Sequence, residues 1–196
     1  MISHEHKFLF IHVPRTSGSS IEIQFKYNDA GMWMVNYDGR KHWTLNQWKE
    51  HLEPEVFETY FKFTIVRNPW DRVISKYCTR NEFGPIGQPA GKSLKYFLDN
   101  YKTPGNEHGE TLIDYFDPEQ MDYIGRFESR EDTLTYVSQK IGVEIDNSYK
   151  LRPVQATIKQ QNDNHHYTEY YDEETKQIVA ERYARDIELF GYEFGD

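Results

Sequence analysis

Short apolar runs alternate with helical patterns along this chain. Two runs of β-forming residues, FLFIHV at 8–13 and FKFTIV at 61–66, are each followed by turn residues. Beyond these turns, residues 19–27 and 70–78 place apolar side chains at helical spacing. Strand, tight turn and helix therefore follow one another twice, as they do when a parallel sheet is built from βαβ units.

Further elements are predicted from the residues that begin and end them. MDYIGRFE at 121–128 reads as a third strand, and Ser129 with Asp132 has the pattern of a capping box that opens a helix to about Ile141. Other helical signals cover residues 44–51, a short stretch from Pro54, residues 93–101, and a continuous helix over 172–191 that Gly191 closes. The predicted fold class is α/β, with a parallel β-sheet flanked by helices.

Length and composition fit one folded domain. A globule of 196 residues buries roughly 70% of its unfolded surface, which is enough for one core. No repeat, linker or low-complexity segment divides the chain. We therefore predict a single α/β domain over residues 1–196.

Charge and cysteine content narrow the possible partners. The formal net charge of −9 argues against a broad basic face for nucleic acid, so any anion must be bound by a local cluster of positive groups. The single cysteine, Cys78, allows no intramolecular disulfide and no zinc-type cluster, so we expect a reducing, cytoplasmic compartment and no metal site. We expect no membrane partner, because no apolar run approaches the roughly 20 residues that span a bilayer and the start lacks a signal-peptide pattern.

The stretch after the first strand, PRTSGSS at 14–20, has the features of an anion-binding loop. A glycine-containing turn between a parallel strand and a helix directs free backbone N–H groups and the positive end of the helix dipole at one point. Arg15 adds a planar donor group that matches an oxyanion, and the hydroxyl groups offer further donors. The alternative is purely structural, with Gly18 permitting a turn and Ser19 capping the helix.

This loop differs from the mononucleotide pattern G-x-x-x-x-G-K-[ST]. Pro14 stands roughly where the first glycine would fall, and no lysine precedes a hydroxyl. A Mg²⁺-nucleotide site also uses a carboxylate at the end of a neighbouring strand, whereas the strand at 61–66 is followed by Arg67. Both departures argue against an ordinary ATPase, and the arginine at position 67 favours a second anion there.

A second candidate anion site lies in FTIVRNPWDRVISKY at 63–77. Arg67 leaves the carboxyl end of a predicted strand, where ligands of open α/β sheets bind, and Ser75 lies on the helix that follows. Together they could clamp one phosphate. The alternative is that Arg67 forms a salt bridge with Asp71 and that Ser75 is a small packing residue.

The two stretches together resemble a known family. VPRTSGSS and FTIVRNPWDRVISKY look like the paired 5′-phosphosulfate loop and 3′-phosphate motif of sulfotransferases that use 3′-phosphoadenosine-5′-phosphosulfate (PAPS), specifically of the carbohydrate-type sulfotransferase family 2. The pattern R-[DN]-P-x-x-R-x-x-S is intact at 67–75. The likeness continues through YIGRFES and the C-terminal stretch, and is thin at 28–60 and 83–118.

The resemblance implies a P-loop NTPase-like sulfotransferase fold and roles for matching positions. Residues 14–20 would embrace the 5′-phosphosulfate, with Arg15 where the family usually has lysine, and Arg67 with Ser75 would hold the 3′-phosphate. The implied PAPS-binding residues are Pro14, Arg15, Thr16, Ser17, Gly18, Ser19, Ser20, Arg67 and Ser75. The implied reaction transfers the sulfuryl group to an acceptor hydroxyl and releases adenosine 3′,5′-bisphosphate, without a metal.

The reaction needs a general base, and His42 in GRKHWT is the candidate, beside Arg15 as the second catalytic residue. Members of the family commonly place a histidine or glutamate between the first helix and the second strand. A surface histidine beside Lys41 is the alternative interpretation. Asp38 and Glu22 are other possible bases, although Asp38 lies in a glycine-containing turn and Glu22 belongs to the first predicted helix.

Six further residues are weaker candidates: Trp70, Tyr123, Arg126, Lys159, His165 and His166. The lysine and the two histidines lie in a polar segment that in the family can fold over the nucleotide, and a solvated loop explains them equally well. The arginine could touch the cofactor or acceptor, but an internal ion pair is the simpler interpretation. Packing is favoured over adenine contact for both aromatic residues.

Two other functions compete with the sulfotransferase hypothesis. A divergent P-loop kinase of small molecules would bind ATP and depend on Mg²⁺. A catalytically inactive nucleotide-binding module would keep the anion site and have no need of His42 as a base. For a sulfotransferase, the acceptor expected from the resemblance is a carbohydrate or small metabolite, and a peptide tyrosine is also compatible.

Overall fold

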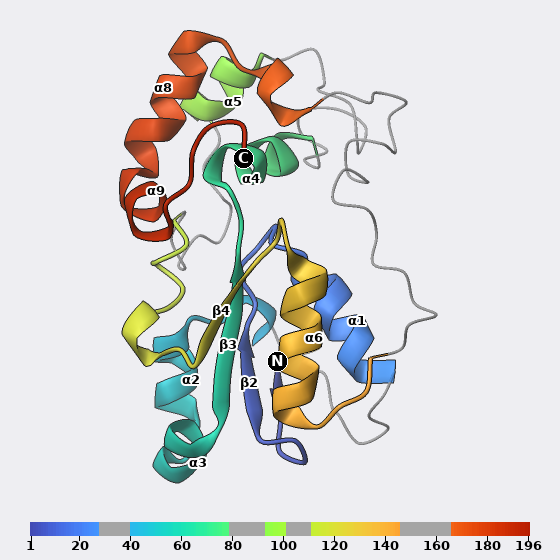
Figure 1. The fold of residues 1–196 in the computed structure, drawn as a ribbon. Helices are drawn as coiled ribbons and strands as arrows, with labels where there is room; N and C mark the ends of the chain where they lie inside the picture. Colours follow the sequence, from blue (N-terminus) through green and yellow to red (C-terminus); the bar gives the residue numbers. More distant parts are fainter. Residues whose placement is uncertain (28–39, 79–92, 101–110, 146–165) are drawn as a thin grey trace. The chain divides into compact units, whose positions relative to one another are not determined.

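The computed structural model describes residues 1–27, 40–78, 93–100, 111–145 and 166–196 (Figure 1). Contacts divide the chain into two compact units. The first comprises Met1–Val66 with Glu107–Leu151, and the second comprises Arg67–Asn106 with Arg152–Asp196. The single domain predicted over residues 1–196 stays a prediction.

The first unit contains a four-stranded, mostly parallel sheet in the order β1-β2-β3-β4. Its strands are β1 Ile2–Ser3, β2 Phe8–Ile11, β3 Phe61–Val66 and β4 Tyr123–Arg126. β2 pairs with β3 and β3 with β4 in parallel, which confirms the predicted α/β fold. The antiparallel edge strand β1 was not predicted, because two residues are too few to show a period.

Helices cover both faces of this sheet. They are α1 Gly18–Tyr27, η1 Arg40–His42, α2 Leu45–His51, α3 Pro54–Thr59, η3 Pro118–Gln120 and α6 Arg130–Ile141. Figure 1 shows α1 and α6 on one side of the strands and α2 and α3 on the other. The predicted cap of α2 is confirmed, because the Thr44 hydroxyl accepts from the Gln47 N–H at 3.2 Å.

Apolar side chains on one face of the sheet form the core of the first unit. Phe10 of β2 stacks on Phe63 of β3 with ring centroids 4.8 Å apart. The remaining members come from the helices and strands around them and include Phe8, Ile21, Phe25, Ile65, Leu134, Val137 and Ile141. Each such side chain contributes roughly 1.5–3 kcal/mol when fully buried. This packing fixes β2 beside β3, so that both strands end at the same edge of the sheet.

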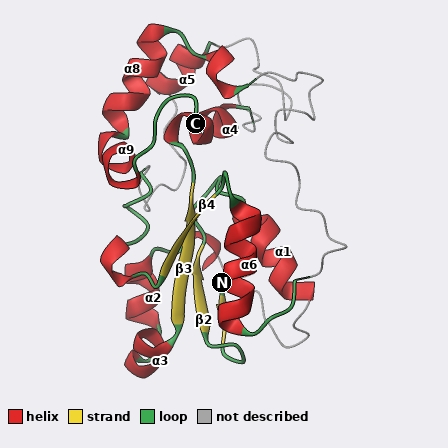
Figure 2. Cartoon of the chain, in the orientation of Figure 1, coloured by secondary structure: helices red, strands yellow, loops and turns green. Residues whose placement is uncertain are grey.

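The second unit is helical (Figure 2). Its elements are α4 Pro69–Tyr77, α5 Leu94–Asn100, η4 Tyr167–Tyr170, α8 Glu173–Arg182 and α9 Ala184–Phe190. Asn68 caps α4 by accepting from the Trp70 N–H at 3.1 Å, and Pro69 occupies the first turn. The core of the unit is formed by Trp70, Val73, Ile74, Tyr77, Phe97, Leu98, Val179 and Tyr183.

Two sequence predictions were wrong in detail. Ser129 is the N-cap of α6 but makes no side-chain cap bond, because its backbone (φ −119°, ψ 41°) lies outside the extended region that directs a hydroxyl at the helix. The helix predicted over 172–191 is interrupted at Tyr183, whose ψ of 22° breaks the hydrogen-bond ladder and separates α8 from α9. Gly191, with φ of 61°, ends α9 as predicted.

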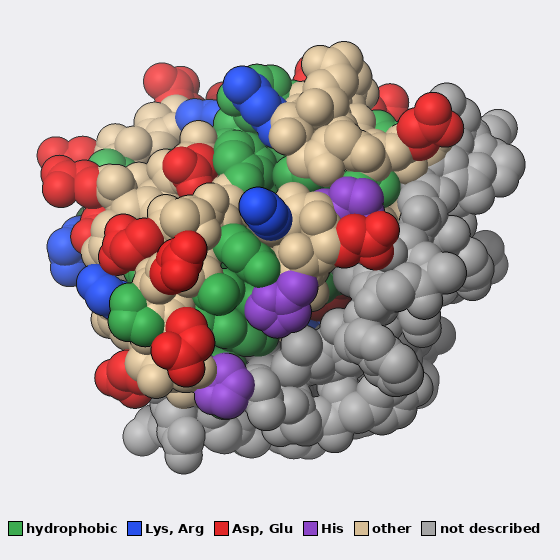
Figure 3. All heavy atoms as spheres, turned by 90° about the horizontal axis from the view of Figure 1, so that it is seen from below, with side chains coloured by type: hydrophobic (Ala, Val, Ile, Leu, Met, Phe, Trp, Pro, Cys, Tyr) green, Lys and Arg blue, Asp and Glu red, His purple; other side chains and the backbone are tan. Residues whose placement is uncertain are grey.

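The end of the sheet at which β2 and β3 begin is unsuited to binding an anion. A pocket there is lined by Phe57, Glu58, Lys62 and residues 119–122, and includes three carboxylates. The Lys62 ammonium is engaged, because it donates to the carbonyls of Phe57 and Tyr60 at 2.9 and 3.0 Å. Figure 3, viewed from this end, shows acidic side chains scattered over the described part of the face. An anion site is therefore expected at the opposite end of the sheet, where β2 and β3 end.

Among the described residues, no helix is both long and apolar enough to cross a bilayer. Over the same ranges, no three side chains of His, Cys, Asp or Glu come together as a metal-binding group.

We predict that Gly125→Ala destabilises the first unit by about 1–3 kcal/mol. A Cβ on Gly125 of β4 would lie 2.9 Å from the Cβ of Thr133 on α6, and closer still to its γ atoms. Urea unfolding of the variant measures the loss. Gly125→Ala combined with Thr133→Ala should recover part of it, because the overlapping γ atoms are gone; a double variant no more stable than the single one would contradict close packing as the cause.

Candidate active site

The loop between β2 and α1 is held by its own hydrogen bonds. The Thr16 hydroxyl donates to the carbonyl of Val13 at 2.9 Å and is fully buried. The carbonyl of Ser17 accepts from the N–H groups of Ser20 and Ile21 at 2.9 and 3.2 Å. The Thr16 hydroxyl hydrogen therefore closes the loop, whereas the sequence had suggested it as a donor to the ligand.

Two residues of this loop have left-handed backbone conformations. Arg15 has φ of 69° and Ser17 has φ of 72°. Such conformations cost about 1 kcal/mol or more for residues with a Cβ, and they concentrate at ligand sites. Left-handed residues that alternate with others turn successive N–H groups toward one side and form anion-binding concavities. The loop geometry therefore fits the predicted anion site.

Gly18 has a different role from the one that its place in a turn suggests. It begins α1, and a Cβ built on it would overlap the ring of His12, lying 2.6 Å from Cγ and nearer to two other ring atoms. Glycine is needed here so that the His12 ring can approach the backbone closely. Ser19 does not cap the helix either, because it lies inside the first turn, after Ser17 and Gly18.

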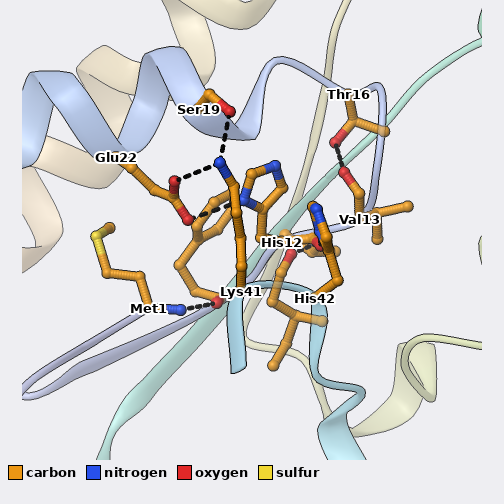
Figure 4. Close-up of polar contacts among 11 residues, drawn as sticks. Met1, His12, Val13, Thr16, Ser19, Glu22, Lys41 and His42 are labelled. Carbon is orange, nitrogen blue, oxygen red and sulfur yellow. Dashed lines mark hydrogen bonds and ion pairs between the residues drawn. The ribbon is translucent and has the colours of Figure 1, made fainter. Parts of the chain in front are cut away.

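A buried polar cluster lies beneath the loop and joins three segments (Figure 4). Glu22 of α1, 2% exposed, accepts from the ring of His12 with Nδ1 and Oε1 2.8 Å apart. Lys41 of η1 approaches the other carboxylate oxygen, with Nζ 3.5 Å from Oε2. The Lys41 ammonium also donates to the hydroxyl of Ser19 at 2.9 Å.

Burial and hydrogen bonding set the charges in this cluster. Burial lowers the pKa of His12 to about 4, although its bond to Glu22 opposes the shift. Burial alone would raise the pKa of Glu22, but the hydrogen bond from His12 and the charge of Lys41 outweigh it and hold that pKa below its ordinary value. Near neutral pH the pair is therefore a neutral imidazole donating to a carboxylate.

His42, the predicted base, is oriented by the backbone of the same loop. Its Nδ1 lies 3.0 Å from the carbonyl oxygen of His12. A carbonyl only accepts, so Nδ1 carries the hydrogen and, in the neutral ring, Nε2 is the basic nitrogen. The ring packs edge-on against His12, with centroids 4.6 Å apart, and is half-buried. In this tautomer, the nitrogen that would accept a proton is Nε2.

The second predicted motif lies in the second unit. Arg67 follows β3 directly in the chain and is 3% exposed. Its Nε donates to Asp71 at 2.7 Å, which is the salt bridge that the structural alternative expected. Ser75 on α4 is 1% exposed. It follows Asp71 by four residues, as Asp71 follows Arg67, so the helix places Asp71 and Ser75 on one face.

The alternative bases and weaker candidates divide into three groups. Asp38, Lys159 and His165 lie outside the described residues. Glu22 is engaged by His12 and Lys41, so it supports the site from below. The rest are placed as follows: Trp70 packs in the helical core, Tyr123 stacks on Tyr136 at 4.3 Å, Arg126 is exposed, and His166 is hydrogen-bonded to Thr168 at 2.8 Å.

Sequence reasoning missed His12 and Lys41 as parts of the site, and it missed the left-handed backbone of Arg15 and Ser17. His12 carried a signal, because it is the polar residue in an otherwise apolar strand run that leads into the loop. Lys41 was considered only as a neighbour of His42. Arg15 and Ser17 gave no sign of positive φ, which sequence patterns associate with glycine and asparagine.

We predict that His12 makes the protein less stable in acid. Because its folded-state pKa is lowered from 6.5 to about 4, the unfolded state binds its proton more tightly, and stability is lost as pH falls through that window. The loss approaches about 3 kcal/mol. Urea unfolding at pH 7, 5.5 and 4 measures it against His12→Asn, which keeps a donor for Glu22 and does not titrate there. Equal pH dependence of the two proteins would refute the assignment.

The chain matches the sulfotransferase family over residues 1–193. Carbohydrate sulfotransferase 14 of Danio rerio is 24% identical over 98% of this chain and 61% of its own length. Carbohydrate sulfotransferase 10 of Homo sapiens is 25% identical over 71% of this chain and 49% of its own length. The alignments thus span about half to three fifths of these relatives, and no solved structure gives a significant match. From the match over nearly its whole length, the chain belongs to the sulfotransferase family.

Proposed function

We propose that this chain transfers the sulfuryl group of PAPS to a hydroxyl group of a carbohydrate acceptor. One observation carries the proposal: the predicted base contacts the segment that leads into the predicted anion loop, since His42 Nδ1 lies 3.0 Å from the carbonyl oxygen of His12, two residues before Pro14. Family membership and two relatives named as carbohydrate sulfotransferases support the reaction type and the acceptor class. A small-metabolite hydroxyl is the second acceptor class.

The donor would be held at both of its anionic ends. The N–H groups of the left-handed loop, the N-terminus of α1 and the Arg15 guanidinium supply donors for the 5′-phosphosulfate. Arg67 and Ser75 are the proposed ligands of the 3′-phosphate, on the strength of the R-[DN]-P-x-x-R-x-x-S pattern at 67–75. The Asp71 carboxylate on Nε fixes the plane of the Arg67 guanidinium.

The proposed step is an in-line displacement at sulfur. The acceptor oxygen forms a bond to sulfur while its proton moves to Nε2 of His42, and the bond from sulfur to the bridging phosphate oxygen breaks. Negative charge grows on the oxygen of the departing adenosine 3′,5′-bisphosphate, where Arg15 and the loop N–H groups stabilise it. A positioned base contributes about 10²–10⁴ to such a rate.

The nucleotide preference distinguishes this function from that of a small-molecule kinase. We expect adenosine 3′,5′-bisphosphate to raise the melting temperature more than AMP or ATP with Mg²⁺, because only the bisphosphate and PAPS carry a 3′-phosphate. At 100 times its dissociation constant, a ligand adds about 2.7 kcal/mol to stability, which is a shift of a few degrees in differential scanning fluorimetry.

Arg67→Ala gives the matched test of the 3′-phosphate site. The affinity for the bisphosphate should fall about tenfold or more while that for AMP changes little, so the ratio is independent of any lost stability. Arg185→Ala, an exposed arginine of α9 in the same unit, is the control. Stabilisation by ATP with Mg²⁺ and not by the bisphosphate would support the kinase alternative.

Replacement of His42 separates an enzyme from an inactive binding module. His42→Asn can still donate to the carbonyl of His12 but has no basic nitrogen, so transfer of labelled sulfate to a panel of oligosaccharides should fall by about 10²–10⁴. Affinity for the bisphosphate should stay within about twofold. Unchanged transfer would remove His42 as the base.

A further inference from the structure

The β2–α1 loop contains no lysine, but the structure brings one to it from another segment. Lys41 belongs to η1 (Arg40–His42), and its ammonium donates to the hydroxyl of Ser19 at 2.9 Å. Ser19 is the second residue of α1 and one of the residues assigned to the 5′-phosphosulfate. A cation therefore lies at the edge of the loop. The Lys41 ammonium is compact and rotatable, whereas the Arg15 guanidinium is planar.

The position of Lys41 allows it to reach an anion bound in the loop. The first turn of α1 leaves backbone N–H groups unsatisfied, so an anion held there lies beside Ser19. An oxygen hydrogen-bonded to the Ser19 hydroxyl would be within about 6 Å of Nζ, and a change of lysine rotamer closes that gap. The Lys41 side chain is 34% exposed, which leaves its ammonium accessible.

The neighbour of Lys41 indicates which end of the donor it would meet. Lys41 and His42 extend from the same short helix, Lys41 toward Ser19 and Glu22 and His42 toward the carbonyl of His12 (Figure 4). The base must stand next to the acceptor oxygen that attacks sulfur. A cation carried by the adjacent residue thus belongs to the sulfuryl end of the donor.

Charge compensation explains how the ammonium is kept at this place when no anion is bound. The Glu22 carboxylate lies 3.5 Å from Nζ and is buried, and the neutral His12 ring does not compete with it as a second cation. The contacts with Glu22 and Ser19 thus keep the Lys41 ammonium at the edge of the loop.

We propose that Lys41 is a second cationic ligand of the transferring sulfuryl group and acts beside Ser19 and Arg15. The proposal rests on the proposed function, since it assigns a residue to the donor site described above. It adds a contact to the sulfuryl group that is made when PAPS binds and is kept during transfer, and it involves no proton exchange by Lys41.

The test compares two nucleotides that differ only in the sulfuryl group. Lys41→Met keeps the length of the side chain and removes its charge. We expect its affinity for PAPS and its single-turnover transfer rate to fall about 10- to 100-fold, and its affinity for adenosine 3′,5′-bisphosphate to stay within about threefold. Lys49→Met, an exposed lysine of α2 in the same unit, should change neither.

The ratio of the two affinities distinguishes ligand contact from structural support. A purely structural role would weaken both nucleotides alike, and such an equal loss, or a Lys41→Met variant that matches Lys49→Met, would overturn the proposal. Lys41→Arg keeps the charge and should retain most of the affinity for PAPS, and a loss as large as that of Lys41→Met would also count against it. Failure of the unaltered protein to bind either nucleotide would instead refute the proposed function.

Discussion

The buried carboxylate of Glu22 holds together three segments that are distant in the sequence. It accepts from His12 at the end of β2, lies on α1, and faces Lys41 of η1. A buried carboxylate must find hydrogen bonds or countercharge, since leaving it unpaired would cost several kcal/mol. The contacts that satisfy this one group therefore join the residue after β2, the helix α1 and the short helix η1 to one another.

The contacts around Glu22 also help to explain how a short loop keeps Arg15 and Ser17 in left-handed backbone conformations. Its flanks are immobilised by the β2–β3 pairing on one side and by the Glu22 cluster on the other, so the strained residues have little freedom to relax. Donors that are already in place do not have to be reorganised when negative charge develops near them. The packing below the loop therefore holds the loop's N–H groups in place.

Much of the fold could be predicted because it follows local rules. β3 was found at its observed bounds, Phe61–Val66, and the cap of α2 at Thr44, since an apolar run and a capping residue act within a few positions. The break at Tyr183 and the missing cap bond of Ser129 depend on backbone angles that neighbouring residues do not reveal. In the candidate site, the anion loop and His42 were predicted from pattern and resemblance. The pairing of His12 with Glu22 joins a strand to a helix face, which no periodicity reports.

The absence of a side chain at Gly18 has a consequence for how this protein can change. The His12 ring occupies the space that a Cβ would need, so positions 12 and 18 share a single volume. A larger residue at one position is tolerable only with a smaller one at the other, and a smaller apolar residue at 12 would remove the hydrogen bond that His12 donates to Glu22. Sequence change at positions 12 and 18 is therefore coupled to position 22. Substitutions that the fold would accept together would each be destabilising when introduced alone.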